Sequence, residues 1–121
     1  MEKRTPYVQV WQELSREKSM IFLAGPRQSG KTTLAKLIAG NFSNSLYWNW
    51  DIADHREQFF QYNDFFTHMI RKDASAPLII FDEIHKYKDW KNYLKGVYDQ
   101  FHEEFKFLIS GSGRLDIYQK G

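Results

Sequence analysis

Apolar and polar residues along the chain follow two different periods, which predict strands and helices in turn. Four short runs have strand length and are apolar on both faces, as strands inside a parallel sheet are. These runs are Met20–Ala24, Leu46–Trp50, Pro77–Phe81 and Phe105–Ile109. Segments with helical spacing lie before and between them. Because strands alternate with helices, the pattern predicts an α/β fold with a mainly parallel sheet of about four strands.

Four helices are expected around these strands. They are an N-terminal helix within residues 1–19, Lys31–Ala39, a helix from Asp54 to Lys72 that breaks near Asn63 and Asp64, and Trp90–Phe101. In the second helix, Leu34, Leu37 and Ile38 are expected to face the core. The third helix is expected to begin with a capping box formed by Asp54 and Glu57. The chain thus reads as one domain, 1–121, with an N-terminal helix (1–19) before a core (20–121).

Composition excludes several classes of protein. The 121 residues are 42% hydrophobic and 26% charged, which is enough apolar material to offset the entropy of ordering the chain. The absence of Cys excludes disulfides and thiolate metal sites. No apolar run approaches the ~20 residues of a membrane span, and no signal peptide is expected, so a cytoplasmic location is predicted. The net charge of +2 is too small to indicate nucleic acid by itself.

A glycine-rich motif follows the first predicted strand and precedes the second helix. Its sequence fits G-x-x-x-x-G-K-[ST], in which curled backbone N–H groups and a helix N-terminus receive phosphate oxygens. The residues expected to contact the nucleotide are Gly25, Pro26, Arg27, Gln28, Ser29, Gly30, Lys31, Thr32 and Thr33. Lys31 would reach the β- and γ-phosphates, and the hydroxyl of Thr32 would ligate Mg²⁺. The alternative is a glycine-rich turn with a surface lysine. The side chain of Arg27 could approach a phosphate or a neighbouring subunit, but it is expected to point to solvent.

Two adjacent carboxylates, Asp82 and Glu83, follow the third predicted strand. A carboxylate at the carboxyl end of a buried strand faces the crevice where α/β proteins bind ligands. Asp82 would hold the Mg²⁺ shell, and Glu83 would orient and deprotonate the attacking water. The alternative is a pair of acids that ends a strand in solvent. The gap between the two motifs leaves room for one further strand between them in sequence.

A third candidate is the tight loop expected after the fourth strand. Ser112 is our first choice for a group that touches the γ-phosphate or the water, and Ser110 is the second, although an ordinary turn would explain both. His85 could hydrogen-bond to the site, but a surface or packing position is favoured. Asp51 is expected to have a structural role in a turn.

Two groups of side chains could serve another partner. Lys88, Lys91 and Lys95 share a helix face alongside Lys86, which could meet nucleic acid but is expected to be solvated. Several aromatic side chains could stack on nucleobases but are expected in the core because of their strand and helix spacing. They are Tyr47, Trp48, Trp50, Phe59, Phe60, Phe65 and Phe66.

The motifs together resemble AAA+-type ATPases, in particular a group of bacterial and archaeal ATPases with an N-terminal AAA domain and a C-terminal domain of unknown function. The resembling stretches are Leu23–Leu34, Ile80–Lys86 with Trp90, and Leu108–Tyr118. The resemblance implies a three-layer α/β/α sandwich of the P-loop NTPase (AAA+/ASCE) type. It implies an ATP-hydrolysing core built on Lys31, Thr32, Asp82, Glu83 and a sensor-like Ser112. It also implies a fifth strand and a helical lid, before which this chain is expected to be truncated.

These observations predict a domain that binds Mg·ATP and hydrolyses it to ADP and phosphate in the full-length protein. One alternative is a P-loop phosphotransferase such as a small-molecule kinase, against which Glu83 directly after Asp82 argues. Another is a nucleotide-dependent switch that binds ATP without turnover. The expected partners are ATP and ADP. In the full-length protein, a homo-oligomer or a protein partner is a further possibility. A nucleic-acid partner is weakly indicated, and no membrane is expected.

Overall fold

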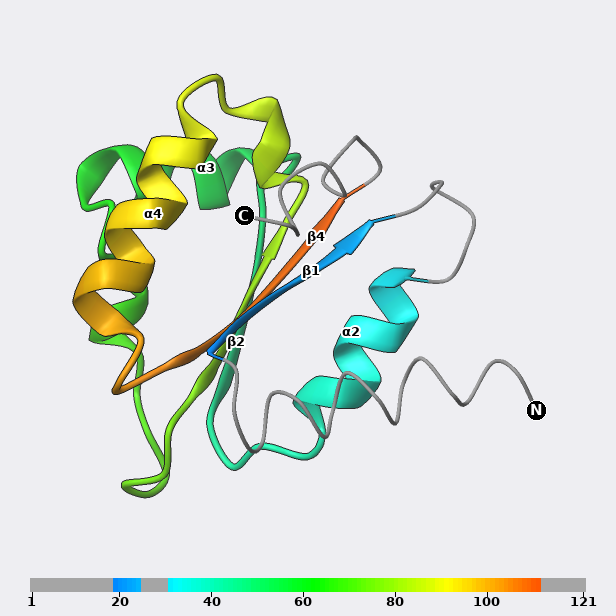
Figure 1. Ribbon diagram of the computed structural model, residues 1–121, viewed down its shortest axis with the longest axis vertical. Coiled ribbons are helices and arrows are strands. Elements are labelled where there is room, and N and C mark those ends of the chain that lie inside the picture. Colours follow the sequence, from blue (N-terminus) through cyan, green and yellow to red (C-terminus); the bar gives the residue numbers. More distant parts are fainter. Residues whose placement is uncertain (1–18, 25–30, 112–121) are drawn as a thin grey trace.

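A parallel sheet lies at the centre of the computed structural model, which describes residues 19–24 and 31–111 (Figure 1). Its strands are β1 (Met20–Ala24), β2 (Ser45–Asn49), β3 (Leu78–Asp82) and β4 (Lys106–Gly111). Within the described residues their order is β1-β4-β3-β2, and every neighbouring pair is parallel. The predicted α/β class with a parallel sheet is therefore confirmed. The strand expected between the two motifs is β2.

Helices cover both faces of the sheet, which makes three layers (Figure 1). One face carries α2 (Lys31–Ala39), and the other carries α3 (Ala53–Gln61) and α4 (Trp90–Phe101). Two short 3₁₀ helices, η2 (Phe65–His68) and η3 (Ile84–Lys86), complete the described elements. Within the described part of the chain, no helix combines the length and the apolar character that a membrane span requires.

The sheet divides the apolar interior into two clusters because successive side chains of a strand point to opposite faces. In β3, Leu78 and Ile80 pack toward α2, whereas Ile79 and Phe81 pack toward α3 and α4. The α3/α4 side is dominated by aromatic rings. Its buried members include Trp48, Phe59, Phe65, Phe66, Phe105 and Phe107. The prediction that the candidate aromatic side chains lie in the core is therefore confirmed for four of them: Trp48, Phe59, Phe65 and Phe66.

The strand boundaries differ from the predictions by one or two residues. β2 begins and ends one residue earlier than expected, and β3 one residue later. Ser110 and Gly111 are the last residues of β4 rather than part of a loop, because they lie in register with Leu23 and Ala24 of β1. Sheet pairing with a neighbouring strand therefore extends β4 beyond the apolar run that indicated it.

The helix predictions need correction around α3. The capping box is wrong: α3 begins at Ala53, Ile52 is the N-cap residue, and no side chain caps the helix. The predicted break near Asn63 and Asp64 is confirmed, since α3 ends at Gln61 and a turn follows. Beyond the break the predicted helix to Lys72 is wrong, because only the 3₁₀ helix η2 forms there. The segment after η2 is not helical, and the N–H group of Lys72 donates to the side chain of Asn44 instead.

The inward face of α2 also differs from the prediction. Leu37 is 58% exposed, whereas Ala35 and Ile38 are fully buried against the sheet. These two residues are spaced i, i+3 on the stripe that faces β3 and β4. The predicted N-terminal helix falls within residues 1–18, which lie outside the described residues, so the division into a helix and a core stays a prediction.

Candidate nucleotide site

The candidate site lies where the strands reach their carboxyl ends, and the N-terminus of α2 lies at the same end (Figure 1). Lys31 and Thr32 are the first two residues of α2, which follows β1 after six positions of the glycine-rich motif. Thr33 is exposed on the same turn. Gly25 to Gly30 and Ser112 lie outside the described residues. The described arrangement is thus strand, motif, helix, as the motif requires.

Asp82 and Glu83 are both buried at this end of the sheet, with exposed fractions of 2% and 7%. Asp82 ends β3 and is in register with Asn49 of β2 on one side and Ser110 of β4 on the other. Its position in β3 gives it the same parity as Leu78 and Ile80, so its side chain belongs to the face that α2 covers. The interpretation of these two acids as a strand end in open solvent is therefore wrong.

Two hydroxyl groups hold the carboxylate of Asp82. The Tyr47 hydroxyl donates to Asp82 Oδ2 over 2.6 Å, and the Ser110 hydroxyl donates to Oδ1 over 2.9 Å. The side-chain amide of Asn49 donates to the Tyr47 oxygen over 3.0 Å. A chain of hydrogen bonds thus crosses β2, β3 and β4 and is centred on Asp82.

The electrostatics of this chain favour a neutral tyrosine. Burial, and next the hydrogen bond to Asp82, raise the pKa of Tyr47 above its ordinary value. The pKa shift has this sign because ionised Tyr47 would be poorly solvated and would repel the neighbouring carboxylate. Tyr47 therefore keeps its proton and remains a donor to Asp82 at neutral pH.

Glu83 has an unusual backbone conformation. Its φ of 60° and ψ of 23° are left-handed, and it is the one non-glycine residue with positive φ within the described residues. Such a conformation is unfavourable for most side chains and persists where the surroundings hold it. Here the Glu83 N–H donates to the Ser110 carbonyl over 2.7 Å, and the residue leads into η3. The left-handed turn redirects the chain immediately after Asp82.

Two cationic or potentially cationic side chains from η3 lie next to the Glu83 carboxylate. His85 Nε2 is 3.5 Å from Glu83 Oε1, and Lys86 Nζ is 3.7 Å from the same oxygen. Lys86 also lies 2.8 Å from Asp51, which follows β2. The His85 side chain is partly buried beside Glu83, which is compatible with the packing position favoured for it and also places it near the candidate site. Asp51 has a charged partner in addition to the structural role expected for it.

Sequence reasoning ranked Ser112 above Ser110 and missed Tyr47. Ser110 is fully buried against Asp82. Tyr47 was grouped with core aromatics, but it lies two residues before the end of β2 and has the parity of Asn49, which pairs with Asp82. A polar group at that position and parity, beside a strand that ends in a carboxylate, is the signal that could have identified it.

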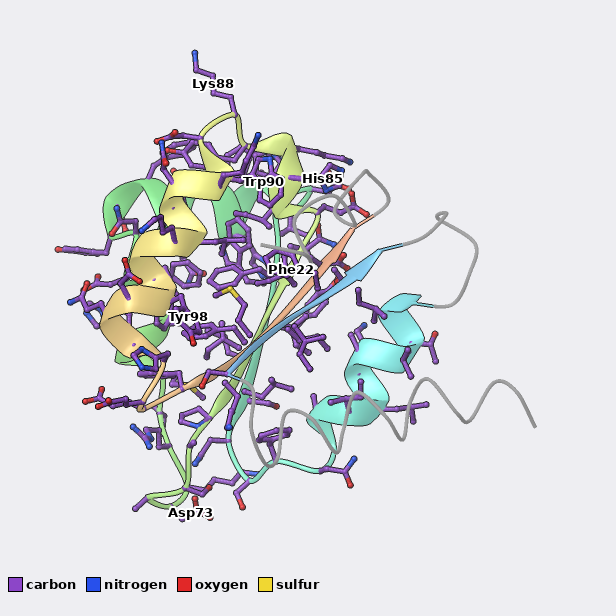
Figure 2. The ribbon with its side chains drawn as sticks, viewed as in Figure 1. Phe22, Asp73, His85, Lys88, Trp90 and Tyr98 are labelled. Atoms are coloured by element: carbon purple, nitrogen blue, oxygen red, sulfur yellow. The ribbon has the colours of Figure 1, made fainter. Side chains whose placement is uncertain are left out.

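Of the remaining candidates, Trp50 contacts Asp82 through its backbone, where its N–H donates to the Asp82 carbonyl over 3.0 Å. Phe60 is 67% exposed, against the core expectation, and Trp50 is half-buried. Lys88, Lys91 and Lys95 are exposed, and Lys95 pairs with Asp99 at 3.5 Å. Figure 2 shows Lys88 pointing away from the body of the molecule, while His85 lies toward the carboxyl ends of the strands.

The donor set at Asp82 fits a magnesium ion that is shared with a nucleotide. Within residues 19–24 and 31–111, no three His, Asp or Glu side chains gather to hold a metal ion by themselves. Mg²⁺ is commonly held by one or two carboxylates together with substrate phosphates and water. A single oriented carboxylate at the end of the sheet where α2 begins matches that requirement.

The sheet order, the strand–motif–helix unit and the buried acids define a P-loop NTPase domain. Comparison with protein families agrees: the family described as an AAA domain matches residues 17–121, so the chain belongs to that family and is an AAA+-type P-loop ATPase domain. Its fold resembles the crystal structure of the P-loop NTPase domain of the Sigma-54 transport activator from E. coli. The TM-score is 0.57 at 17% identity, over 91% of this chain and 87% of that chain. Among curated proteins, none matches this chain.

Proposed function

We propose that this domain binds Mg·ATP at the carboxyl ends of β1, β3 and β4 and hydrolyses it to ADP and phosphate. The observation that carries the proposal is the burial of Asp82 and Glu83 at the end of the sheet where α2 begins. Burying two adjacent acids is costly unless they are held by donors or serve a ligand. Membership of the AAA family supports nucleotide binding by this end of the sheet.

Each residue has a role in this proposal. Backbone groups of Gly25, Pro26, Arg27, Gln28, Ser29 and Gly30 would surround the phosphates. Lys31 would neutralise phosphate charge, and Thr32 and Asp82 would hold Mg²⁺, with Thr33 beside them on α2. When bound, Mg²⁺ would offset the negative charge of the phosphate oxygens. Glu83 would accept a proton from the attacking water, and Ser112 would contact the γ-phosphate or that water.

Nucleotide binding is tested by titrating a fluorescent ATP analogue into the 121-residue chain with Mg²⁺. The Lys31→Ala variant should bind at least about tenfold more weakly, because it lacks the cation that meets the phosphates. Lys88→Ala is the matched control, since it removes an exposed lysine that points away from the site (Figure 2). Equal binding by the Lys31→Ala variant and the unchanged chain would overturn the proposed site.

Hydrolysis is tested separately by phosphate release, with Glu83→Gln as the variant. If Glu83 is the general base, turnover should fall by about 10²–10⁴-fold while the analogue still binds. Binding without phosphate release in the unchanged chain would favour the nucleotide-dependent switch instead. Faster phosphate transfer to an added hydroxyl acceptor than to water would favour a phosphotransferase.

Assembly and location also belong to the proposal. Family membership supports contact between several copies of the domain or with a protein partner. Light scattering with and without Mg·ATP would reveal a nucleotide-dependent oligomer. We assign the domain to the cytoplasm because its proposed substrate, ATP, is present there.

A further inference from the structure

We infer that Tyr47 is a positioning residue for magnesium: its hydroxyl fixes the Asp82 carboxylate in the orientation that receives the ion. This inference rests on the proposed function, because it assumes that Asp82 meets Mg²⁺. Tyr47 acts through Asp82 and is not itself a ligand in this arrangement. The hydrogen bond of 2.6 Å between Tyr47 and Asp82 Oδ2 carries the inference.

The Asp82 carboxylate is held from both sides. Ser110, on β4, donates to Oδ1, and Tyr47, on β2, donates to Oδ2. Rotation of the carboxylate about its final torsion would break both bonds. A carboxylate has about four acceptor positions, so accepting from two hydroxyls is compatible with coordination of a metal or its water. The two donors are neutral hydroxyls, so neither cancels the negative charge that attracts the cation.

The Tyr47 ring is itself held in place. Its hydroxyl accepts from Asn49, and the Lys36 ammonium lies 4.9 Å from the centre of the ring. The ring also forms part of the wall of a cavity of about 500 Å³ between α2 and β2, which Lys36 and Ile80 line as well. Lys36 is on the helix that begins at Lys31. Tyr47 therefore links the phosphate-binding helix to the metal-holding carboxylate.

The Tyr47 hydroxyl is the donor in its hydrogen bond to Asp82, because an ionised carboxylate oxygen can only accept. A phenylalanine at this position would keep the ring and its contact with Lys36, and it would remove the hydroxyl that donates to Asp82 and accepts from Asn49.

The test compares the unchanged chain with Tyr47→Phe by titrating Mn²⁺, monitored by electron paramagnetic resonance, in the presence of a non-hydrolysable ATP analogue. Loss of a hydrogen bond to a charged group should weaken metal binding about tenfold. Binding of the fluorescent ATP analogue in EDTA should not change, because the phosphate contacts remain. Tyr98→Phe is the matched control, since it removes a hydroxyl from the exposed face of α4 (Figure 2).

The outcomes separate this inference from the proposed function. If Tyr47→Phe binds Mn²⁺ and nucleotide as the unchanged chain does, the inference is overturned and the proposed function stands. If nucleotide binding in EDTA weakens in Tyr47→Phe by as much as Mn²⁺ binding does, Tyr47 has a general structural role and the inference is again overturned. If the unchanged chain binds no nucleotide, both fail. Ser110→Ala provides a second variant: it removes the other donor to Asp82 and should weaken Mn²⁺ binding in the same way.

Discussion

The Lys86 ammonium lies 2.8 and 3.0 Å from the two carboxylate oxygens of Asp51. This ion pair connects η3 to the turn after β2. The same ammonium is 3.7 Å from Glu83 Oε1. Lys86 therefore faces two carboxylates and makes the shorter contacts with Asp51. Because Glu83 is the proposed base, the strength of the Lys86–Asp51 pair influences how firmly Lys86 holds Glu83.

Replacing Asp51 with Asn should slow hydrolysis without weakening nucleotide binding. The neutral amide would no longer balance Lys86, whose charge would then act mainly on Glu83. Partly exposed ion pairs contribute up to about 1 kcal/mol, so turnover should fall by about two- to fivefold. Steady-state phosphate release and titration of the ATP analogue measure the two quantities separately.

The control for this prediction is Lys86→Met, which keeps the apolar stem and removes the charge. This variant should not show the loss of turnover, and neither should the double variant with Asp51→Asn. A fall in turnover of the same size in the double variant would mean that Asp51 acts on the site without Lys86. The prediction would then be contradicted.

Much of the fold could be predicted because its signals are local. Runs such as Leu78–Phe81 are apolar on both faces, and that pattern identified every described strand within two residues. The helix α4 was predicted with its observed limits because its apolar stripe is continuous. The segment from Tyr62 to Lys72 was mispredicted because tertiary contacts decide its structure. There, two adjacent rings, Phe65 and Phe66, are both buried, and the Asn44 side chain holds the N–H of Lys72.

The site was predictable only where a residue type follows a strand. Asp82 and Glu83 were proposed in that way, and the structure buries both of them at the end of β3. Tyr47 and Lys86 do not follow that pattern. Tyr47 could have been found from its position and parity in β2 only once β2 was placed beside β3, since that pairing brings it to Asp82. Ser110 was expected in a loop for a similar reason, since pairing with β1 extends β4 to Gly111.

Phe66 and Phe60 allow a direct test of the aromatic core. Phe66 is fully buried, with ring centres of Phe101, Phe105, Phe107 and Phe81 within 5.1–6.0 Å, whereas Phe60 is 67% exposed. The free energy of unfolding should fall by about 3–5 kcal/mol in Phe66→Ala. In Phe60→Ala it should fall by less than about 1 kcal/mol. Urea denaturation followed by circular dichroism measures both.

A loss of that size can unfold a domain of ordinary stability, so Phe66→Leu serves as a milder variant of the buried ring. It should still lose more stability than Phe60→Leu. Equal losses at the two positions would show that the buried cluster is not packed as described.

The stability of the fold should depend on acid pH through Asp73. This residue lies at the end of the sheet opposite His85 (Figure 2). Its Oδ1 accepts from the Ser75 N–H over 2.9 Å and from the Asn44 amide over 3.0 Å, and the Ser75 hydroxyl donates to it as well. These bonds, first of all those from Ser75, lower the pKa of Asp73 from 3.8 to about 2. Asn44, in turn, accepts from Lys72, so the turn is tied to the start of β2.

The sign of the resulting pH dependence follows from linkage. A carboxylate whose pKa is lower in the folded chain binds fewer protons there than in the unfolded chain, so its contribution is complete above the unfolded pKa. For Asp73 that contribution should be lost as the pH falls from 3.8 toward about 2. The unchanged chain should therefore melt at a higher temperature than Asp73→Asn at neutral pH, and the difference should shrink through this window. Thermal unfolding from pH 7 to pH 2 measures it, with Glu104→Gln as the exposed control. If the melting temperatures of the unchanged chain and Asp73→Asn differ by the same amount at pH 7 and at pH 2, the hydrogen bonds to Asp73 do not stabilise its ionised form, and the prediction is contradicted.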